Sequence, residues 1–266
     1  DFTKVTMSNT FADATTGAVT DVFAITNAKD GLATLSLNAL DLTDASVTFA
    51  RQTDGTANAL TIVSSVASAA GSIAANDEET LTFDSSAGAM DYTAVSATDM
   101  TTLVVKGDEQ MDLGTLTGTI LASVDATGLE DSDGANADFI FDMSSSTVNM
   151  TVTGNASSTH GGDMQITTGS GADTITGTKQ VDTIDAGAGA DNVSGGAGAD
   201  VITGGTGDDT LTGGAGADVF NYDAAFGDDT ITDFTAGASG DVLDFQAFGS
   251  VLQQSPSVVL HLLTIK

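Results

Sequence analysis

An aspartate recurs every nine positions between residues 168 and 221, and glycines fill most of the runs that precede these aspartates. The six are Asp173, Asp182, Asp191, Asp200, Asp209 and Asp218. Glycine permits positive φ and leaves peptide carbonyls uncovered, so main-chain oxygens can approach an ion closely. Each aspartate adds a carboxylate, which completes the all-oxygen shell that a hard cation such as calcium prefers. The spacing therefore predicts a row of calcium sites along this stretch.

Short strands must position these groups, because an apolar residue stands two places after each aspartate. The six are Ile175, Ile184, Val193, Ile202, Leu211 and Phe220. Each reads as the inward-pointing residue of a strand whose neighbours point outward. A glycine-rich flexible linker is the competing interpretation, but a linker would not keep an apolar residue at one phase six times. We predict that these side chains are buried in two columns.

The repeats GGAGADVIT (195–203) and GGTGDDTLT (204–212) match the pattern G-G-x-G-x-D-x-U-x, which resembles the calcium-binding nonapeptide of RTX proteins. The resemblance implies a right-handed parallel β-roll in which two nonapeptides form one 18-residue coil, with calcium between stacked turns. It pairs Asp173 with Asp191, Asp182 with Asp200, Asp191 with Asp209 and Asp200 with Asp218. Besides the six aspartates, the candidate calcium ligands are Asp229 and the loop glycines Gly169, Gly171, Gly187, Gly189, Gly195, Gly196, Gly198, Gly204, Gly205, Gly207, Gly213, Gly214 and Gly216.

The second nonapeptide, GTKQVDTID (177–185), departs from the pattern. Thr178, Lys179 and Gln180 replace its glycines, and Lys179 is the only base in the tract. We expect a weak or absent ion where this turn would contribute, although Ile184 keeps the core register.

The composition is strongly acidic, with 37 acids against 6 bases in 266 residues and a net charge of −31. Such a chain excludes nucleic acid as a natural partner, because phosphate binding needs the opposite charge, and it repels itself unless cations are present. The chain has no cysteine, and no apolar run approaches the length of a membrane span. It begins with Asp1 and shows no signal peptide. We expect a fragment or processed form of an extracellular protein.

The remainder predicts an all-β chain in three parts. Leu81, Leu103 and Val124 lie in phase at intervals of 22 and 21 residues, a period typical of a β-solenoid. Residues 59–75 favour strand and loop over helix because of their β-branched side chains. We predict a Thr/Ser-rich β-solenoid over 1–158, a calcium-binding roll over 159–222 and a C-terminal cap and secretion-signal-like region over 223–266.

The C-terminal part contains the sequence FGDDTITDFTAGASGDVLDF (226–245). Asp229 and Ile231 resemble a final nonapeptide displaced by two residues. Four apolar residues are candidates to plug the open end of the roll, which would otherwise expose core and strand edges. They are Phe234, Leu243, Phe245 and Phe248.

A narrower resemblance comes from L-x-x-V-D-A-T-G (121–128) and T-V-T-G-N (151–155) leading into the repeats. This arrangement is similar to the C-terminal region of RTX-type S-layer proteins of Gram-negative bacteria. The resemblance implies type I secretion, calcium-dependent self-assembly and a lattice on the cell surface. It also implies attachment to lipopolysaccharide or surface polysaccharide through a portion that would precede residue 1. Two alternatives are a secretion and folding module of a larger secreted enzyme or toxin, and a fragment of an RTX adhesin or matrix protein.

We predict that the chain is not an enzyme. It contains neither an H-E-x-x-H zinc motif nor a G-x-S-x-G nucleophile elbow. His160 and His261 lie about a hundred residues apart in the sequence, and His160 is expected in a solvated loop. The acidic run 77–79 is likewise expected to be a solvated loop.

Overall fold

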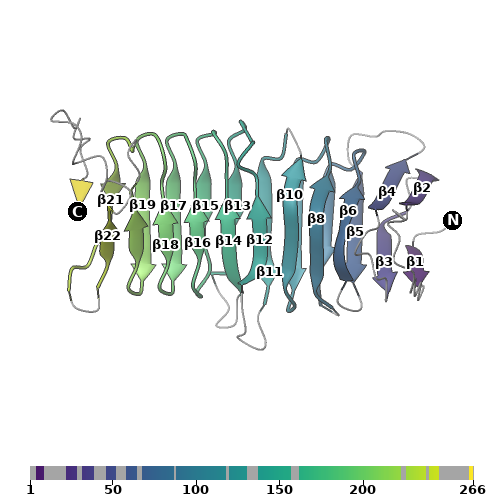
Figure 1. Cartoon of the computed structure of the whole chain (residues 1–266), viewed down its shortest axis with the longest axis horizontal. Coiled ribbons are helices and arrows are strands. Elements are labelled where there is room, and N and C mark those ends of the chain that lie inside the picture. Colours follow the sequence, from purple (N-terminus) through teal and green to yellow (C-terminus); the bar gives the residue numbers. More distant parts are fainter. Residues whose placement is uncertain are drawn as a thin grey trace, which may run out of the picture. The chain divides into compact units, whose positions relative to one another are not determined.

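The computed structural model describes residues 4–8, 22–28, 32–38, 46–51, 58–64, 68–86, 88–117, 120–130, 137–156, 162–222, 226–237, 240–245 and 264–265. The chain divides into two compact units, Asp1–Asp142 and Met143–Lys266. Within each unit the strands alternate between two parallel sheets, one of odd-numbered and one of even-numbered strands (Figure 1). This is a parallel β-solenoid, and the all-β prediction is confirmed. The described part has no helix that could cross a membrane. The three-part division at residues 158 and 222 stays a prediction.

The described residues of the first unit form twelve strands. They are β1 (Lys4–Ser8), β2 (Val22–Ala28), β3 (Thr34–Asn38), β4 (Ser46–Arg51), β5 (Ala59–Ser64), β6 (Ser68–Ala74), β7 (Thr80–Asp84), β8 (Met90–Ser96), β9 (Thr102–Gly107), β10 (Met111–Thr117), β11 (Ser123–Leu129) and β12 (Ala137–Asp142). The predicted phase is confirmed, because Leu81 pairs with Leu103 and Leu103 with Val124. Residues 59–64 and 68–74 are strands, as expected for this β-branched stretch.

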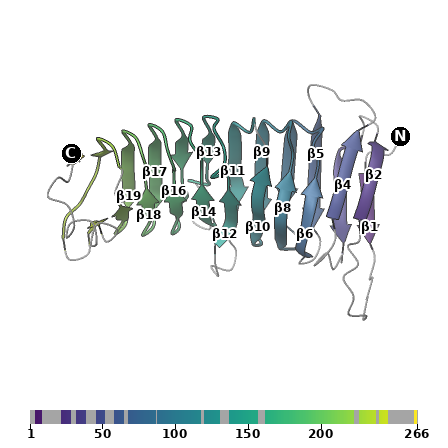
Figure 2. The same cartoon turned by 45° about the horizontal axis from the view of Figure 1, so that its top comes forward.

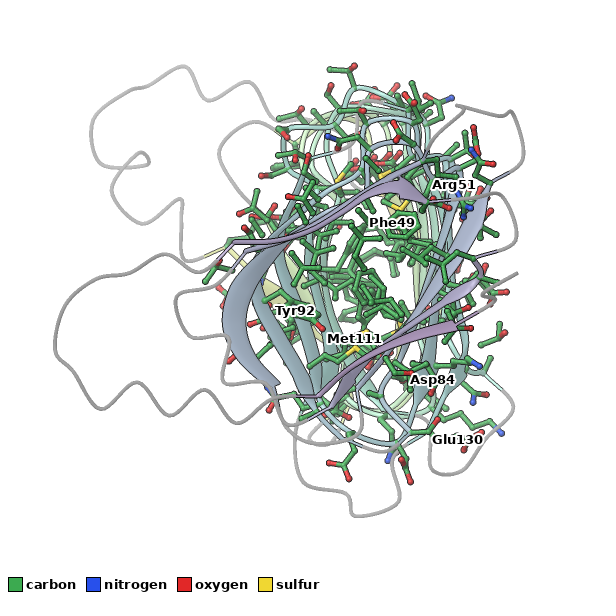
Figure 3. All side chains as sticks on the ribbon, turned by 90° about the vertical axis from the view of Figure 1, so that its right-hand side faces the viewer. Phe49, Arg51, Asp84, Tyr92, Met111 and Glu130 are labelled. Carbon is green, nitrogen blue, oxygen red and sulfur yellow. The ribbon has the colours of Figure 1, made fainter. Side chains whose placement is uncertain are left out.

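The interior of the first unit is filled by side chains from both sheets. Phe49, Tyr92 and Met111 point inward (Figure 3) and are at most 2% exposed. The ring of Tyr92 packs against that of Phe83 at 5.9 Å between centroids. The β8, β10 and β12 strands were not predicted from the sequence. The aligned repeats between residues 77 and 142 cover only one strand of each coil, and the other strand follows after a turn of variable length.

The expectation that residues 77–79 form a solvated loop is wrong for Glu78, whose side chain is fully buried. Arg51 Nε donates to Glu78 Oε1 at 2.6 Å and Arg51 Nη2 donates to Glu78 Oε2 at 2.8 Å. Arg51 lies beside Phe49, with its guanidinium carbon 5.4 Å from the ring centre (Figure 3). Burial raises the pKa of Glu78, while the hydrogen bond and charge of Arg51 act against that rise. A charge can be buried here because its partner is buried with it.

Eleven strands lie in the part of the second unit that the structure describes, and several of them are only three residues long. They are β13 (Thr151–Thr153), β14 (Asp163–Thr167), β15 (Thr174–Thr176), β16 (Thr183–Asp185), β17 (Asn192–Ala197), β18 (Val201–Thr203), β19 (Thr210–Ala215), β20 (Val219–Asn221), β21 (Thr230–Ile231), β22 (Val242–Asp244) and β23 (Thr264–Ile265). The β15, β17 and β19 strands stack in one sheet, and the β16, β18 and β20 strands stack in the other. Figure 2 labels β17 and β19 of the first sheet and β16 and β18 of the second.

The two predicted apolar columns are confirmed. Ile175, Val193 and Leu211 are register partners in one sheet. The partners in the other sheet are Ile184, Ile202 and Phe220. All six side chains are at most 1% exposed. Two nonapeptides therefore make one coil, as the resemblance to RTX repeats implies.

Phe234, Leu243 and Phe245, which were predicted to cover the C-terminal end of the roll, lie against its last residues. The ring of Phe234 lies 6.4 Å from that of Phe220, and Leu243 is the register partner of Phe220. Phe245 stacks on Tyr222 at 5.1 Å but stays 40% exposed. Phe248 lies outside the described residues, as do both histidines.

Candidate metal centre

Each repeat aspartate stands immediately before a short strand, at the end of a loop. The apolar residue two positions later is buried in the core, and residues two positions apart in a strand point to the same side. The aspartates of all six repeats, together with Asp229, are at most 2% exposed. Aspartate is rarely buried this completely without a partner.

The aspartates form two hydrogen-bonded ladders along the roll. The N–H of each donates to Oδ1 of the aspartate one coil further on. The pairs are Asp173–Asp191 (2.7 Å), Asp191–Asp209 (2.9 Å) and Asp209–Asp229 (3.0 Å) in one ladder, and Asp182–Asp200 (2.8 Å) and Asp200–Asp218 (3.0 Å) in the other. The structure thus brings together the pairs that the 18-residue coil predicts, and it places Asp229 in the ladder 20 residues after Asp209.

The second carboxylate oxygen, Oδ2, is buried without a hydrogen-bond partner in six of these aspartates. They are Asp173, Asp191, Asp200, Asp209, Asp218 and Asp229. A buried polar atom without a partner costs free energy, and an ionised one costs far more. A regular row of such atoms therefore indicates a ligand that the side chains themselves do not supply.

The electrostatics support the same conclusion. Burial raises the pKa of Asp191 to about 7, and the charges of Asp209 and Asp173 raise it further, while a backbone hydrogen bond lowers it. Burial likewise raises the pKa of Asp200 and of Asp229 to about 6. Without a cation these carboxyls would take up protons in mildly acidic solution, at a higher pH than an ordinary aspartate does. A divalent cation would replace those protons and favour the carboxylate form.

The glycine loops supply main-chain oxygens beside the carboxylates. The glycines at the second and fourth positions of the third to sixth repeats have φ between +85° and +158°, a region that residues with a side chain rarely adopt. A methyl group on Gly198 would overlap the carbonyl oxygen of Gln180, and one on Gly207 would overlap that of Gly189. A methyl group on the glycine that opens the fourth, fifth or sixth repeat would overlap Oδ2 of the aspartate in the same repeat, as with Gly195 and Asp200.

The first two repeats differ from the later ones. Gly169 and Gly171 do not have a positive φ. In the second repeat Asp182 is fully buried, but its Oδ2 accepts a hydrogen bond from the N–H of Thr178 at 2.6 Å. The residues predicted to bind calcium are thus all placed in or beside the ladder, but their surroundings are not equivalent.

Sequence reasoning missed Asp241, which continues the second ladder. The N–H of Asp218 donates to Oδ1 of Asp241 at 3.0 Å, and Oδ2 of Asp241 accepts from the N–H of Thr235 at 2.7 Å. Asp241 precedes Leu243 by two positions, which is the same D-x-U signal as in the repeats. It lies 23 residues after Asp218 instead of 18, so a search at fixed spacing passes over it.

These residues fit a calcium ion. Calcium takes six to eight oxygen ligands from carboxylates and backbone carbonyls in flexible geometry. The ladder offers carboxylate oxygens without a hydrogen-bond partner. The loops offer main-chain carbonyl oxygens, such as that of Gln180, that a side chain on the neighbouring loop glycine would overlap. The described part holds no group of three or more His, Cys, Asp or Glu side chains that could bind a metal, so the remaining ligands would be main-chain oxygens. When bound, the ion would supply positive charge between carboxylates that otherwise repel.

Comparison with known proteins supports this assignment. A family model described as the RTX calcium-binding nonapeptide repeat (4 copies) matches residues 167–202 and 194–231. Neither the curated proteins nor the solved structures that were searched gave a match. Residues 167–231 of this chain are RTX calcium-binding nonapeptide repeats.

Proposed function

We propose that the chain is a structural subunit of a calcium-dependent cell-surface lattice of the S-layer type, exported by type I secretion. The observation that carries the proposal is the architecture of the first unit. Its coils are filled by apolar side chains from both sheets, such as Phe83, Leu103 and Met111. A stack of filled coils presents strand faces for assembly, whereas a catalytic unit would be built around a pocket with converging polar groups. We accordingly propose a structural role without catalysis.

The charge explains why assembly would need calcium. Two surfaces of chains that each carry a net charge of −31 repel unless counterions lie between them. Calcium can bridge carboxylates of two copies, or a carboxylate and an anionic group of lipopolysaccharide or surface polysaccharide. The partners of this proposal are therefore further copies of the chain and an anionic cell-surface glycan.

Assembly of the purified chain tests the proposal. Sedimentation velocity and electron microscopy would follow the protein in chelator, in millimolar magnesium and in millimolar calcium. We expect large ordered assemblies in calcium only, because magnesium requires a smaller and stricter octahedral shell. A chain that folds in calcium yet stays monomeric there would overturn the lattice role. That result would favour a secretion and folding module or an adhesin fragment. Micrographs of the native cell surface should show a periodic layer.

A further inference from the structure

Asp182 is the one aspartate of the six repeats whose Oδ2 has a hydrogen-bond partner. Thr178 donates its N–H to Oδ2 at 2.6 Å, and its hydroxyl lies 3.1 Å from both carboxylate oxygens. The N–H of Met164 donates to Oδ1 at 2.8 Å. Both oxygens of this buried carboxylate therefore have protein donors.

Asp200, one coil further along the same ladder, has different partners. Its Oδ1 accepts from the N–H of Asp182 at 2.8 Å, but its Oδ2 is buried without a partner. The two carboxylates are equally buried and occupy the same position of the coil. The difference between them is therefore in the loop that precedes each one.

The loop residues explain this difference. Gly196 and Gly198 precede Asp200 with φ of +110° and +131°, a conformation in which glycine carries no steric penalty. Thr178 and Gln180 stand at the same two positions before Asp182. Residues with a side chain rarely adopt such φ values. This loop instead directs the N–H and the hydroxyl of Thr178 to the carboxylate.

We infer that Thr178 takes the place of a calcium ion at Asp182, so that this rung is held without metal and the calcium sites of this ladder begin at Asp200. The N–H and hydroxyl protons of Thr178 present positive charge to the carboxylate, as an ion would. An ion there would have to displace them. The exposed Lys179 in the same loop adds a further positive charge that disfavours a cation.

This arrangement gives the ladder that runs through Asp182 a metal-independent rung near its beginning. Hydrogen bonds of the protein hold the Asp182 rung before calcium binds, whereas Asp200 and Asp218 further along this ladder have unpartnered oxygens. The Asp182 rung would act as the template on which the calcium-dependent rungs of this ladder order. The inference rests on calcium binding by the nonapeptides, and it is independent of the lattice role.

Calcium stoichiometry of the full chain tests the inference through the matched variants Asp182→Asn and Asp200→Asn. Equilibrium dialysis with elemental analysis would count bound ions, and far-UV circular dichroism in saturating calcium would confirm folding. We expect Asp182→Asn to bind as many ions as the wild type and Asp200→Asn to bind at least one fewer. Equal losses in the two variants would overturn the role of Thr178. A wild type without bound calcium would overturn the calcium assignment itself.

A gain-of-site variant keeps the inference testable if Asp182→Asn fails to fold. The combined change Thr178→Gly, Lys179→Ala and Gln180→Gly restores the repeat pattern while keeping Asp182. We expect this variant to bind one more calcium ion per chain than the wild type. Thr178→Ser, which keeps both donors, should bind the wild-type number. An unchanged count in the restored variant would contradict the inference.

Discussion

The repeat aspartates combine two roles in one side chain. Oδ1 accepts a main-chain hydrogen bond from the preceding coil and thereby locks the position of the carboxylate, as between Asp191 and Asp209. In every repeat except that of Asp182, Oδ2 has no hydrogen-bond partner in the protein. A carboxylate fixed by one oxygen and open at the other is preorganised for an ion, because little side-chain entropy is left to lose on binding. Asparagine could keep the hydrogen bond but not the charge.

The raised pKa values predict opposite pH responses with and without calcium. In the metal-free protein, carboxyls with pKa values of about 6 to 7 in the folded state and 3.8 otherwise bind more protons when folded. Their stabilising contribution is complete below pH 3.8 and is lost as pH rises through 6 to 7. Chelated protein should therefore resist urea better at pH 5.5 than at pH 8. In limiting calcium the order should reverse, because protons compete with the ion.

The control for this prediction is the triple variant Asp191→Asn, Asp200→Asn and Asp229→Asn, studied under the same chelated conditions. The variant keeps the other acidic residues of the chain. If acid stabilises the protein only by reducing its overall negative charge, the variant should still be more stable at pH 5.5 than at pH 8. The site-specific part of the pH response should disappear. If the variant and the wild type respond equally to pH, the ladder carboxyls are not the cause.

Two glycines with positive φ allow the effect of backbone strain to be separated from the effect of close contact with a carbonyl oxygen of the neighbouring coil. Gly207 has φ of +127° and a methyl group there would overlap the carbonyl of Gly189, whereas Gly237 has φ of +157° with nothing within 4 Å. We expect Gly237→Ala to cost about 1–2 kcal/mol through backbone strain alone. Gly207→Ala should cost more and raise the calcium midpoint several-fold. Calcium titrations followed by circular dichroism would measure both, and equal midpoints would contradict the role of the stacked carbonyls.

At the scale of strands and loops, the two units stabilise their coils by different means. The coils of the second unit bury one large apolar side chain for each short strand, so loop chemistry carries much of the order. The β7 to β12 strands of the first unit are five to seven residues long and bury two or more apolar residues each, such as Leu81 and Phe83 in β7. Burial of this kind contributes roughly 1.5–3 kcal/mol per large side chain. The first unit can thus hold its coils by packing alone.

The Arg51–Glu78 pair joins the end of β4 to the turn before β7, and both side chains are at most 1% exposed. Arg51→Met would leave Glu78 buried without its partner, and we expect a loss of about 3–5 kcal/mol. Arg51→Met combined with Glu78→Met should lose less, because no charge is left unpaired. Urea unfolding of calcium-loaded protein measures both. A double variant as unstable as the single one would show that the pair itself supplies the stability.

The sequence predicts the roll far better than the first unit, and the reason is the strictness of the period. Ile175 and Val193 are 18 residues apart in a repeat that keeps a period of nine residues from Asp173 to Asp218. The strands, core residues and aspartates of this stretch can therefore be predicted from the sequence. The β8 and β10 strands lie in coils of variable length, where no fixed phase identifies them. The Arg51–Glu78 pair joins residues 27 apart, and only the fold brings them together. Asp241 is missed because the spacing changes at the end of the roll.

For the whole molecule, the distribution of unpartnered carboxylates predicts which part needs calcium. All the buried carboxylate oxygens without a hydrogen bond among the described residues belong to the second unit, within Asp173–Asp229. Stacked carboxylates at roughly the 4.8 Å spacing of neighbouring strands repel by about 3–4 kcal/mol at an effective dielectric near 20. The buried carboxylate of the first unit, that of Glu78, already has a cationic partner. Calcium removal should therefore act on one unit and spare the other.

Hydrogen–deuterium exchange of the full chain, with and without chelator, would resolve the two units. We expect peptides within 186–222 to lose protection when calcium is removed, since each coil there fixes glycines that lose much backbone entropy on ordering. Peptides within 78–117 should keep their protection, because apolar burial and the Arg51–Glu78 pair hold that unit without metal. Re-addition of calcium should restore the roll, and magnesium should not. Equal loss of protection in both units would show that the solenoid of the first unit depends on the calcium-bound coils, and full protection in chelator would show that the roll does not fold through calcium.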